Sequence, residues 1–394
     1  MPAIWVDLDS LGKNFGILRM RSPGGVVFPV LKADAYGHGA KIVAEFLERI
    51  TKPTECPFFC VARFGEALEV LRSQRTRDVL ILSDRLSSEN YKNLDPKLAE
   101  RIIWVVNDFT DLKDFLPMKL KLRLHLNFNT GMNRLGLEPE LVEQKEFWET
   151  LSQLNRAGHQ FEGILSHLSD GEEDPVVFSS QQVTVFERVV NRLQVDWPAR
   201  MPSDFPKWIH IENSGGNFWA VGKKFSNASR PGLHLYGVIS KLSSEFKDLG
   251  LSPVLEVRAP LRKILKLKKG DRLGYNRTYE CTRESFIGVV GLGYADGVAR
   301  RFSKSDSPQV GFWIYGQRAP LVGVISMDLC HVDLTDHPQI EKLLDRPQGV
   351  FAEWLGSHQT AWDLAHVLGT IPYEILTSLG HRLPRIPAIK NKTP

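Results

Sequence analysis

The residue with the clearest chemical potential is Lys32, which ends an apolar stretch just before a turn of small residues. Burial at a strand end disfavours the charged ammonium, so the pKa of the amine falls and the amine becomes available as a nucleophile or Schiff-base former. Most strand-end lysines instead extend their ammonium into solvent. Here Tyr36 follows one short turn later, and Gly37 and Gly39 leave room for a bound group. The segment therefore predicts a reactive amine beside a binding site.

Other polar residues stand near the ends of further predicted strands. The run Ile211-Glu212-Asn213-Ser214-Gly215-Gly216 offers a hydroxyl and exposed amides to a phosphate near a helix start. Arg230 begins the last strand of this series, Arg134 lies in a glycine-bearing loop, and His167 ends a strand. Taken singly, a serine–glycine turn is more often plain turn chemistry and an arginine in such a loop is more often solvated, whereas a strand-end histidine is as often structural as catalytic.

The composition is that of an ordinary globular protein. The chain has 394 residues, of which 42% are hydrophobic and 24% charged, and this length favours two domains. The formal net charge is +4 and the basic residues are scattered, so we expect no nucleic-acid partner. No apolar run reaches the roughly 18 residues of a membrane span and no apolar leader opens the chain, so we expect a cytoplasmic protein without membrane contact.

The four cysteines, Cys56, Cys60, Cys281 and Cys330, are too few and too dispersed for a disulfide framework. Although Cys56 and Cys60 are close together, no second Cys/His pair at zinc spacing accompanies them. We expect reduced thiols and no metal site.

Apolar, β-branched stretches alternate with amphipathic ones up to about residue 240. Eight stretches have the composition of strands: Gly25–Lys32, Phe58–Ala62, Asp78–Ser83, Ile102–Asn107, Lys121–Asn127, Glu162–His167, Lys207–Asn213 and Ser229–Tyr236. Helical patterns lie between most of them, in Ala40–Ile50, Gly65–Arg72, Glu138–Gln153 and Phe178–Leu193. Eight β/α repeats predict an α/β fold with a (β/α)8 TIM barrel. Its functional residues should lie at the carboxyl ends of the strands, with any phosphate held after strands seven and eight.

Beyond this region the pattern changes to strands and tight turns, which predicts a mainly β C-terminal domain. The expected strands are Pro253–Leu267, Phe286–Leu292, Val310–Ile314 and Leu321–Met327, with a hairpin turn at Tyr315–Arg318 and closing helices at Thr360–Leu368 and Tyr373–Leu379. We place the barrel domain at residues 1–243, the second domain at 244–394 and a linker at Ser243–Gly250. The first dozen residues can pack against either domain.

The segment Val30–Gly39 resembles the pyridoxal-phosphate attachment motif of the alanine racemase family. Further segments resemble motifs of that family in the same order along the chain: Asn129–Gly136, Ser166-His167, Asn213-Ser214, Arg230–Gly237, Gly274–Tyr279, Gly293–Gly297, Ser326–Asp328 and Ile371–Glu374. The resemblance therefore covers essentially the whole chain.

The resemblance implies that Lys32 carries pyridoxal 5'-phosphate and that Arg230 faces the pyridine nitrogen. The phosphate contacts that it implies are Tyr36, Ser214, the backbone amides of Gly232 and Leu233, and Tyr373. Because a guanidinium stays protonated, Arg230 donates a hydrogen bond and leaves the ring nitrogen without its own proton. The ring is then a weak electron sink, which suits a reaction confined to moving one proton at Cα.

Racemisation needs a base on each face of the planar carbanion at Cα. Lys32 can serve one face, and the resemblance assigns the other to Tyr275, reaching in from the partner subunit of a head-to-tail homodimer. Hydrogen bonding through His167 toward Arg230 would lower the pKa of that tyrosine. The resemblance also implies contacts to the substrate or its entrance from Arg134, Met327 and Tyr294.

Two positions depart from the family's pattern. Many members carry a carbamylated lysine seven residues before the arginine of the Thr-Gly-Met loop; here that position is Asn127, and Asn129 replaces the usual aspartate. An amide cannot capture carbon dioxide, so one negative charge is missing near Arg134, which we expect to be partly buried. We hypothesise that a bound chloride replaces it, with the amide of Asn127 donating to the ion.

We therefore expect a pyridoxal-phosphate-dependent racemase that interconverts L- and D-alanine and supplies D-alanine for peptidoglycan. A racemase of broader specificity, acting on serine or basic amino acids, is the nearest alternative, and a panel of L-amino acids would separate the two. A non-catalytic pyridoxal-phosphate carrier on the same barrel would lack a second domain with an opposing tyrosine, so the Gly274-Tyr275 motif argues against it. A fold-related decarboxylase would need a Cys- or Asp-bearing site for a distal amine or carboxylate, and we find no such motif.

Overall fold

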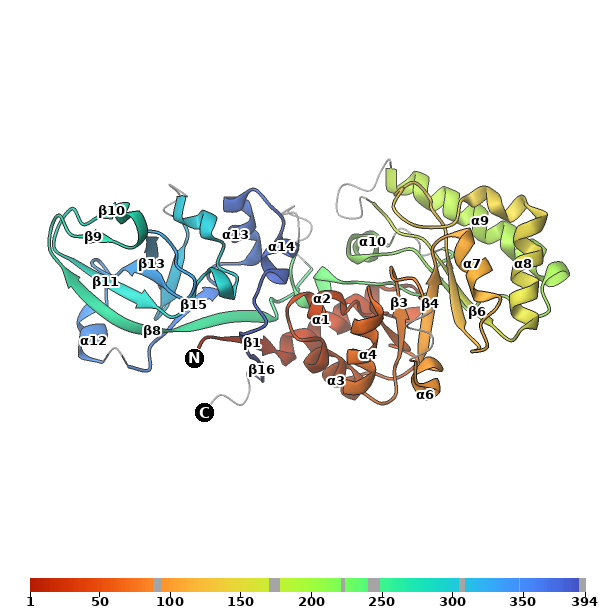
Figure 1. The fold of residues 1–394 in the computed structure, drawn as a ribbon, viewed down its shortest axis with the longest axis horizontal. Coiled ribbons are helices and arrows are strands. Elements are labelled where there is room, and N and C mark those ends of the chain that lie inside the picture. The colour runs from red at the N-terminus through yellow and green to blue at the C-terminus, as the bar shows by residue number, and fades with distance from the viewer. Residues whose placement is uncertain are drawn as a thin grey trace. The chain divides into compact units, whose positions relative to one another are not determined.

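The computed structural model describes residues 1–87, 94–169, 178–220, 224–239, 249–304, 309–346 and 348–389. The chain divides into two compact units, Gly12–Leu235 and Met1–Leu11 together with Tyr236–Pro394 (Figure 1). The domain boundary that we place after residue 243, and most of the linker Ser243–Gly250, lie outside the described residues.

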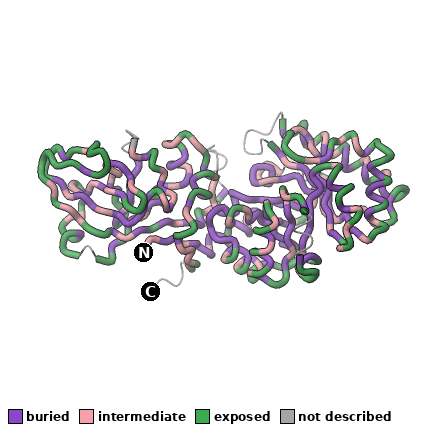
Figure 2. Tube along the Cα trace, viewed as in Figure 1, coloured by how far each residue is buried: buried purple, intermediate pink, exposed green. Residues whose placement is uncertain are grey.

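The unit Gly12–Leu235 is built on a parallel sheet of six strands that pair in chain order. These strands are β2 (Phe58–Val61), β3 (Asp78–Ile81), β4 (Ile102–Val106), β5 (Arg123–Asn127), β6 (Gln160–Leu165) and β7 (Trp208–His210). Strands β2 and β4 are buried along their whole length, as expected for a sheet covered on both faces, and Figure 2 shows this buried layer running through the unit.

The first and eighth predicted strands are not regular strands, so the regular sheet has six strands instead of eight. Both stretches nevertheless lie between β7 and β2: Val27 bridges Ser229 and Val30 bridges Cys60, both in parallel. Each stretch contains a proline, Pro29 or Pro231, which has no backbone N–H for a ladder. The α/β class is confirmed, and the expectation of eight regular strands is corrected by these two interruptions.

Helices connect the strands of this unit along its outside (Figure 1). They are α1 (Leu8–Arg21), α3 (Ala40–Ile50), α4 (Phe64–Ser73), α6 (Pro96–Ala99), α7 (Phe109–Phe115), α8 (Lys145–Arg156), α9 (Phe178–Arg200) and the short α2 (Lys32–Tyr36) and α10 (Ser214–Trp219). Helix α3 has the predicted bounds, whereas α9 continues past the predicted end at Leu193. In the described part of the chain, no helix combines the length and apolar character that a membrane crossing needs.

The second unit is a mainly β domain with one sheet of eight strands, ordered β11-β14-β13-β12-β15-β8-β1-β16. Their bounds are β1 (Ala3–Asp7), β8 (Leu255–Leu267), β11 (Ser285–Val290), β12 (Gly311–Ile314), β13 (Gln317–Val322), β14 (Cys330–Asp333), β15 (Phe351–Leu355) and β16 (Arg385–Ala388). Strand β1 pairs with β8 and β16, so the N-terminal residues pack in this unit. The remaining elements are the pair β9 (Arg272–Leu273) and β10 (Tyr279–Glu280) and the helices α12 (Ile340–Asp345), α13 (Ala361–Leu368) and α14 (Pro372–Thr377).

All four cysteines are buried free thiols. Burial raises the pKa of both Cys56 and Cys60 to about 12, so neither forms a thiolate near neutral pH.

A glycine in β6 makes room for a buried histidine of the neighbouring strand. Gly163 pairs with His125 of β5, and a Cβ atom at Gly163 would lie 2.5 Å from atoms of the His125 ring. The imidazole, which is fully buried, therefore occupies the space that a side chain on β6 would need.

We expect Gly163→Ala to destabilise the barrel unit by about 1–3 kcal/mol, because the added methyl overpacks the His125 ring. The matched control is Gly65→Ala in α4, where nothing lies within 4 Å of the added Cβ. That change should be neutral or stabilising by up to about 1 kcal/mol, because alanine favours helix. Denaturant unfolding of both variants measures the difference. Equal midpoints would contradict the packing argument.

Candidate active site

Lys32 begins a turn with an unusual backbone conformation. The four residues after it, from Ala33 to Tyr36, have φ between +52 and +55°, which is one turn of left-handed helix. This conformation costs an L-residue roughly 1–2 kcal/mol. The structure thus corrects the expected strand end: Lys32 is the first residue of a strained turn, and such strain is typical of functional sites.

Two carboxylates hold this turn in place, and neither was singled out from the sequence. Asp34 accepts a hydrogen bond from the amide of Ala40 at 2.7 Å, and Glu66 accepts one from Ala33 at 2.7 Å. The second oxygen of Glu66 accepts from the amides of Ala62 and Arg63. Glu66 therefore ties the lysine turn to the carboxyl end of β2 and the start of α4.

The Lys32 amine lies in an environment that favours its neutral form. Burial lowers its pKa, the positive charge of Arg134 lowers it further, and Glu66 acts in the opposite direction. Its Nζ is 5.8 Å from the centre of the Tyr36 ring. These causes match the sequence expectation of an amine that is available as a nucleophile.

Ser214, Gly232 and Tyr36 come together at the same end of the barrel. The Ser214 hydroxyl accepts hydrogen bonds from the amides of Gly232 at 3.0 Å and of His234 at 3.4 Å. A Cβ atom at Gly232 would lie 2.2 Å from the Tyr36 hydroxyl, so only glycine fits there. The neighbouring Leu233 is fully buried at the start of the 3-10 helix Leu233–Tyr236. Hydroxyls and backbone amides gathered in this way can bind a phosphate.

Arg230 lies in the barrel interior, with 3% of its surface exposed. Its guanidinium donates to the carbonyl of His210 at 2.8 Å and to that of Ser166 at 2.5 Å, and it also contacts His210 Nδ1. Burial lowers its pKa to about 10, an effect that Glu212 partly opposes. The group stays charged at neutral pH and is held by acceptors from the ends of β6 and β7.

Two histidines, which no sequence signal separates from core residues, extend this network. His210 Nε2 lies 3.0 Å from His125 Nδ1. Burial, and next the charge of Arg123, lowers the pKa of His125 to about 3; burial, and next the charge of Arg230, holds that of His210 well below its usual value. Both imidazoles are therefore neutral and can serve Arg230 as uncharged neighbours.

His167 stands where three cations influence it. Burial, and then the charges of Arg230, Arg134 and Lys32, hold its pKa well below the usual value. Its backbone carbonyl accepts a hydrogen bond from Gln182 at 3.0 Å. The neutral imidazole that these influences favour can accept a hydrogen bond at one ring nitrogen and donate one at the other without adding to the positive charge.

The loop after β5 differs in part from expectation. Arg134 is exposed rather than partly buried, and no ion pair involves it in the described parts of the chain. Asn127 is buried and donates to the Asn107 side chain at 2.7 Å. Asn129 accepts from the amides of Gly131 and Asn133, which shapes the loop that carries the arginine.

The remaining predicted residues belong to the second unit. Tyr275, Tyr294 and Met327 are exposed by 64%, 41% and 51%. Tyr294 and Met327 lie on neighbouring segments, because the amide of Tyr294 donates to Ser326 and that of Ala295 to Met327. Tyr373 lies in α14 and is half-buried.

Together, a barrel that presents an amine of lowered pKa, a hydroxyl and backbone amides able to bind a phosphate, and a buried arginine at the carboxyl ends of its strands has the architecture of a phosphate-cofactor enzyme. No cluster of His, Cys, Asp or Glu suited to a metal ion occurs among the residues that the structure describes.

Comparison with known proteins specifies this class. The family model for the N-terminal domain of alanine racemase matches residues 6–240, and that for its C-terminal domain matches residues 254–387. The chain belongs to the alanine racemase family.

Individual relatives are similar over nearly their whole length. The alanine racemase of Sorangium cellulosum is 31% identical over 96% of this chain and 97% of its own. The crystal structure of alanine racemase from Bacillus anthracis with bound L-Ala-P has a TM-score of 0.83 at 27% identity, covering 99% and 96% of the two chains. That from Bartonella henselae, with covalently bound pyridoxal phosphate, has a TM-score of 0.78 at 27% identity, covering 98% and 99%.

The buried imidazoles predict a stability that depends on pH. In the folded protein the pKa of His125 is about 3, below the ordinary 6.5, so between these values only the unfolded chain binds a proton there. The stability that the uncharged His125 contributes to the folded protein is fully present above pH 6.5 and is lost as the pH falls below that value. We expect the free energy of unfolding to decrease by about 1–3 kcal/mol per pH unit from His125 and His210, and the buried imidazoles of His167 and His234 add to this decrease.

Urea unfolding of the barrel unit between pH 7 and pH 5 measures this slope. His125→Gln should reduce it, because one of these protons no longer contributes. His381→Gln, at an exposed position, is the matched control and should leave it unchanged. An identical slope in His125→Gln and the unmodified protein would refute the assignment.

Proposed function

We propose that the protein is a pyridoxal-phosphate-dependent alanine racemase that interconverts L- and D-alanine with two bases, Lys32 and Tyr275. The observation that carries the proposal is the Lys32 amine with its lowered pKa at the barrel end that also holds the cradle of Ser214 and Gly232. Membership of the alanine racemase family supports it.

The residues present fit the cofactor. Gly232 leaves open the space beside the Tyr36 hydroxyl that any side chain would fill, and the Ser214 hydroxyl lies against the Gly232 amide. We assign the phosphate to these three residues with Leu233, and further to Tyr373. Lys32 would hold the aldehyde carbon, and Arg230 would face the ring nitrogen as a permanent donor. When bound, pyridoxal phosphate supplies a ring that withdraws the electrons left on Cα by deprotonation.

In this proposal Lys32 removes or returns the Cα proton on one face, and its lowered pKa favours the neutral amine that this step needs. Tyr275 does the same on the opposite face. We assign to His167 the hydrogen-bond link between this tyrosine and Arg230, whose positive charge is among the causes that lower the pKa of the imidazole. Arg134, Met327 and Tyr294 bind the substrate carboxylate and define the entrance.

The exposure of Tyr275 supports a site completed by a second copy of the chain. With 64% of its surface exposed, its side chain is available to reach another molecule. We propose a homodimer in which each Tyr275 serves the partner's Lys32. The D-alanine formed would supply peptidoglycan synthesis in the cytoplasm.

Hydrogen exchange at Cα tests the two-base mechanism. The enzyme loaded with pyridoxal phosphate is placed in D2O, and exchange is followed by NMR separately from L- and D-alanine. Lys32→Ala should abolish exchange from both. Tyr275→Phe should lower exchange from one enantiomer by about 10²–10⁴-fold, the usual contribution of a general base, and leave borohydride labelling of Lys32 intact.

The control is Tyr315→Phe, another exposed tyrosine of the same unit, which should exchange normally from both enantiomers. Equal residual exchange from both enantiomers in Tyr275→Phe would exclude a two-base assignment. Borohydride labelling of a lysine other than Lys32 would show that Lys32 does not hold the cofactor.

We also propose that a chloride ion lies near Asn127 and Arg134. Arg134 has no ion-pair partner among the described residues, and the Asn127 amide uses one of its two N–H groups on Asn107. The second N–H can donate to an anion that offsets the arginine charge.

Activity should therefore rise with chloride and not respond to bicarbonate. Asn127→Lys offers a sharp comparison, because a lysine at this position can form a carbamate. The activity of that variant should no longer depend on chloride and should instead rise with bicarbonate. Rates of the unmodified enzyme that are the same in chloride and in gluconate would show that no chloride is needed.

A further inference from the structure

A second cavity lies at the opposite end of the barrel from Lys32. Its volume is about 570 Å³, which lies within the range of small-molecule sites. It is lined by Phe58, Asp78, Arg123, Gln160 and Trp208, the residues at which β2, β3, β5, β6 and β7 begin. The functional residues described above follow the carboxyl ends of the strands, so this cavity is separate from the proposed racemase site.

The aromatic walls of the cavity are fixed by other aromatic rings. Phe58 and Trp208 both pack against Phe28, with ring centres at 3.9 and 5.3 Å. On the other side, Phe161 and Phe205 both pack edge-on against the buried Trp197. The walls are therefore preformed, and a ring that enters can pack on them without reordering the pocket.

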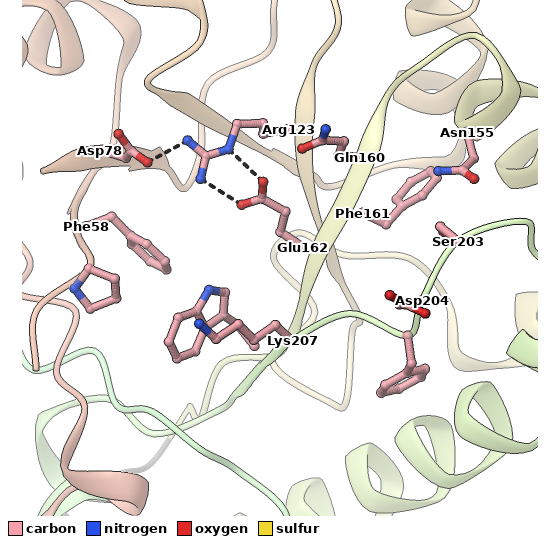
Figure 3. A pocket seen from close by; sticks show the side chains of 13 residues that line it. Phe58, Asp78, Arg123, Asn155, Gln160, Phe161, Glu162, Ser203, Asp204 and Lys207 are labelled. Carbon is pink, nitrogen blue, oxygen red and sulfur yellow. Dashed lines mark hydrogen bonds and ion pairs between the residues drawn. The ribbon is translucent and has the colours of Figure 1, made fainter. Parts of the chain in front are cut away.

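One group of charges at the cavity is already paired, because Asp78 and Glu162 both contact Arg123, and Asp78 also lies 3.8 Å from Nε of Arg101. Arg123 binds Glu162 through two hydrogen bonds of 2.7 and 2.9 Å and Asp78 through one of 2.6 Å (Figure 3). Hydrogen bonds and charges of these two carboxylates raise the pKa of Arg123 although burial opposes this. This cluster closes one side of the cavity and has no free cation to offer a ligand.

Two further charges remain available. Asp204 and Lys207 lie across the cavity from the Arg123 cluster in Figure 3. Among the described residues no ion pair involves either side chain, and they do not pair with each other. The Lys207 ammonium lies 4.4 Å from the centre of the Trp208 ring, which places it directly above an aromatic wall. The cavity thus offers one free anion and one free cation beside apolar rings.

We propose that this cavity binds a zwitterionic aromatic molecule of the α-amino acid class. The ligand's ammonium pairs with Asp204, its carboxylate pairs with Lys207, and its ring packs among Phe58, Phe161 and Trp208. A ligand with only one of the two charges leaves either the anion or the cation unpaired. Recognition therefore depends on both charges together.

The test compares three probes with the same ring: L-phenylalanine, 2-phenylethylamine, which lacks the carboxylate, and 3-phenylpropanoate, which lacks the ammonium. Binding to the enzyme loaded with pyridoxal phosphate is measured by calorimetry with alanine at saturation, so that the racemase site is occupied. L-Phenylalanine should bind about tenfold more tightly than either single-charge probe, the usual effect of one hydrogen bond to a charged group.

Two variants test which side chain binds the ammonium of the ligand and which binds its carboxylate. Lys207→Met should lower the affinity for L-phenylalanine to that for the amine, and Asp204→Asn should lower it to that for the acid. Both variants should keep the alanine turnover of the unmodified enzyme. Lys41→Met, an exposed lysine on α3, is the matched control and should change neither binding nor turnover.

Three outcomes would overturn the proposal. One is the absence of heat from L-phenylalanine up to about 10 mM, a concentration at which even a weak specific site would be partly filled. Another is equal affinity for all three probes. The last is binding of L-phenylalanine that Lys207→Met and Asp204→Asn both leave unchanged, which would place the ligand elsewhere.

Discussion

The buried guanidinium of Arg230 is the group on which the barrel end depends. An uncompensated charge in this position would cost several kcal/mol. The cost is offset by carbonyl groups at the ends of β6 and β7 and by the imidazole of His210. Because these acceptors come from different strands, the arginine fixes their relative positions as well as its own.

The strained turn after Lys32 is stabilised from outside itself. Four consecutive residues with positive φ would not persist in an isolated peptide, because each costs roughly 1–2 kcal/mol. Glu66 offsets part of this cost by accepting from the first amide of the turn and from two amides at the end of β2. Its negative charge also limits how far burial can lower the pKa of Lys32. One carboxylate thus sets both the geometry and the proton affinity of the reactive amine.

How much could be predicted from sequence depends on whether the signal is local. The helix Ala40–Ile50 was correct at both ends because its apolar periodicity is strong and Gly39 precedes it. The interruptions in the first and eighth strands have a local signal in the sequence, because Pro29 and Pro231 cannot donate a backbone hydrogen bond to a neighbouring strand. Glu66 and His125 carried none, because their roles arise from neighbours distant in the chain. Motif resemblance singled out Lys32, Ser214 and Arg230, whose roles stay predictions, and it could not show that Arg134 is exposed.

The exposed side chains of the second unit support the proposal of a site shared between two copies of the chain. Tyr275, Tyr294 and Met327 are large and apolar over most of their surface, yet each is at least 41% exposed. Large apolar side chains held at a surface mark places where another molecule binds. Tyr275 lies in a short 3-10 turn in which Asn276 and Arg277 both have positive φ, a conformation that constrains the backbone next to the tyrosine. A tyrosine that is exposed but held on a constrained turn would lose little conformational freedom on entering another copy of the chain, and this supports the homodimer that we propose.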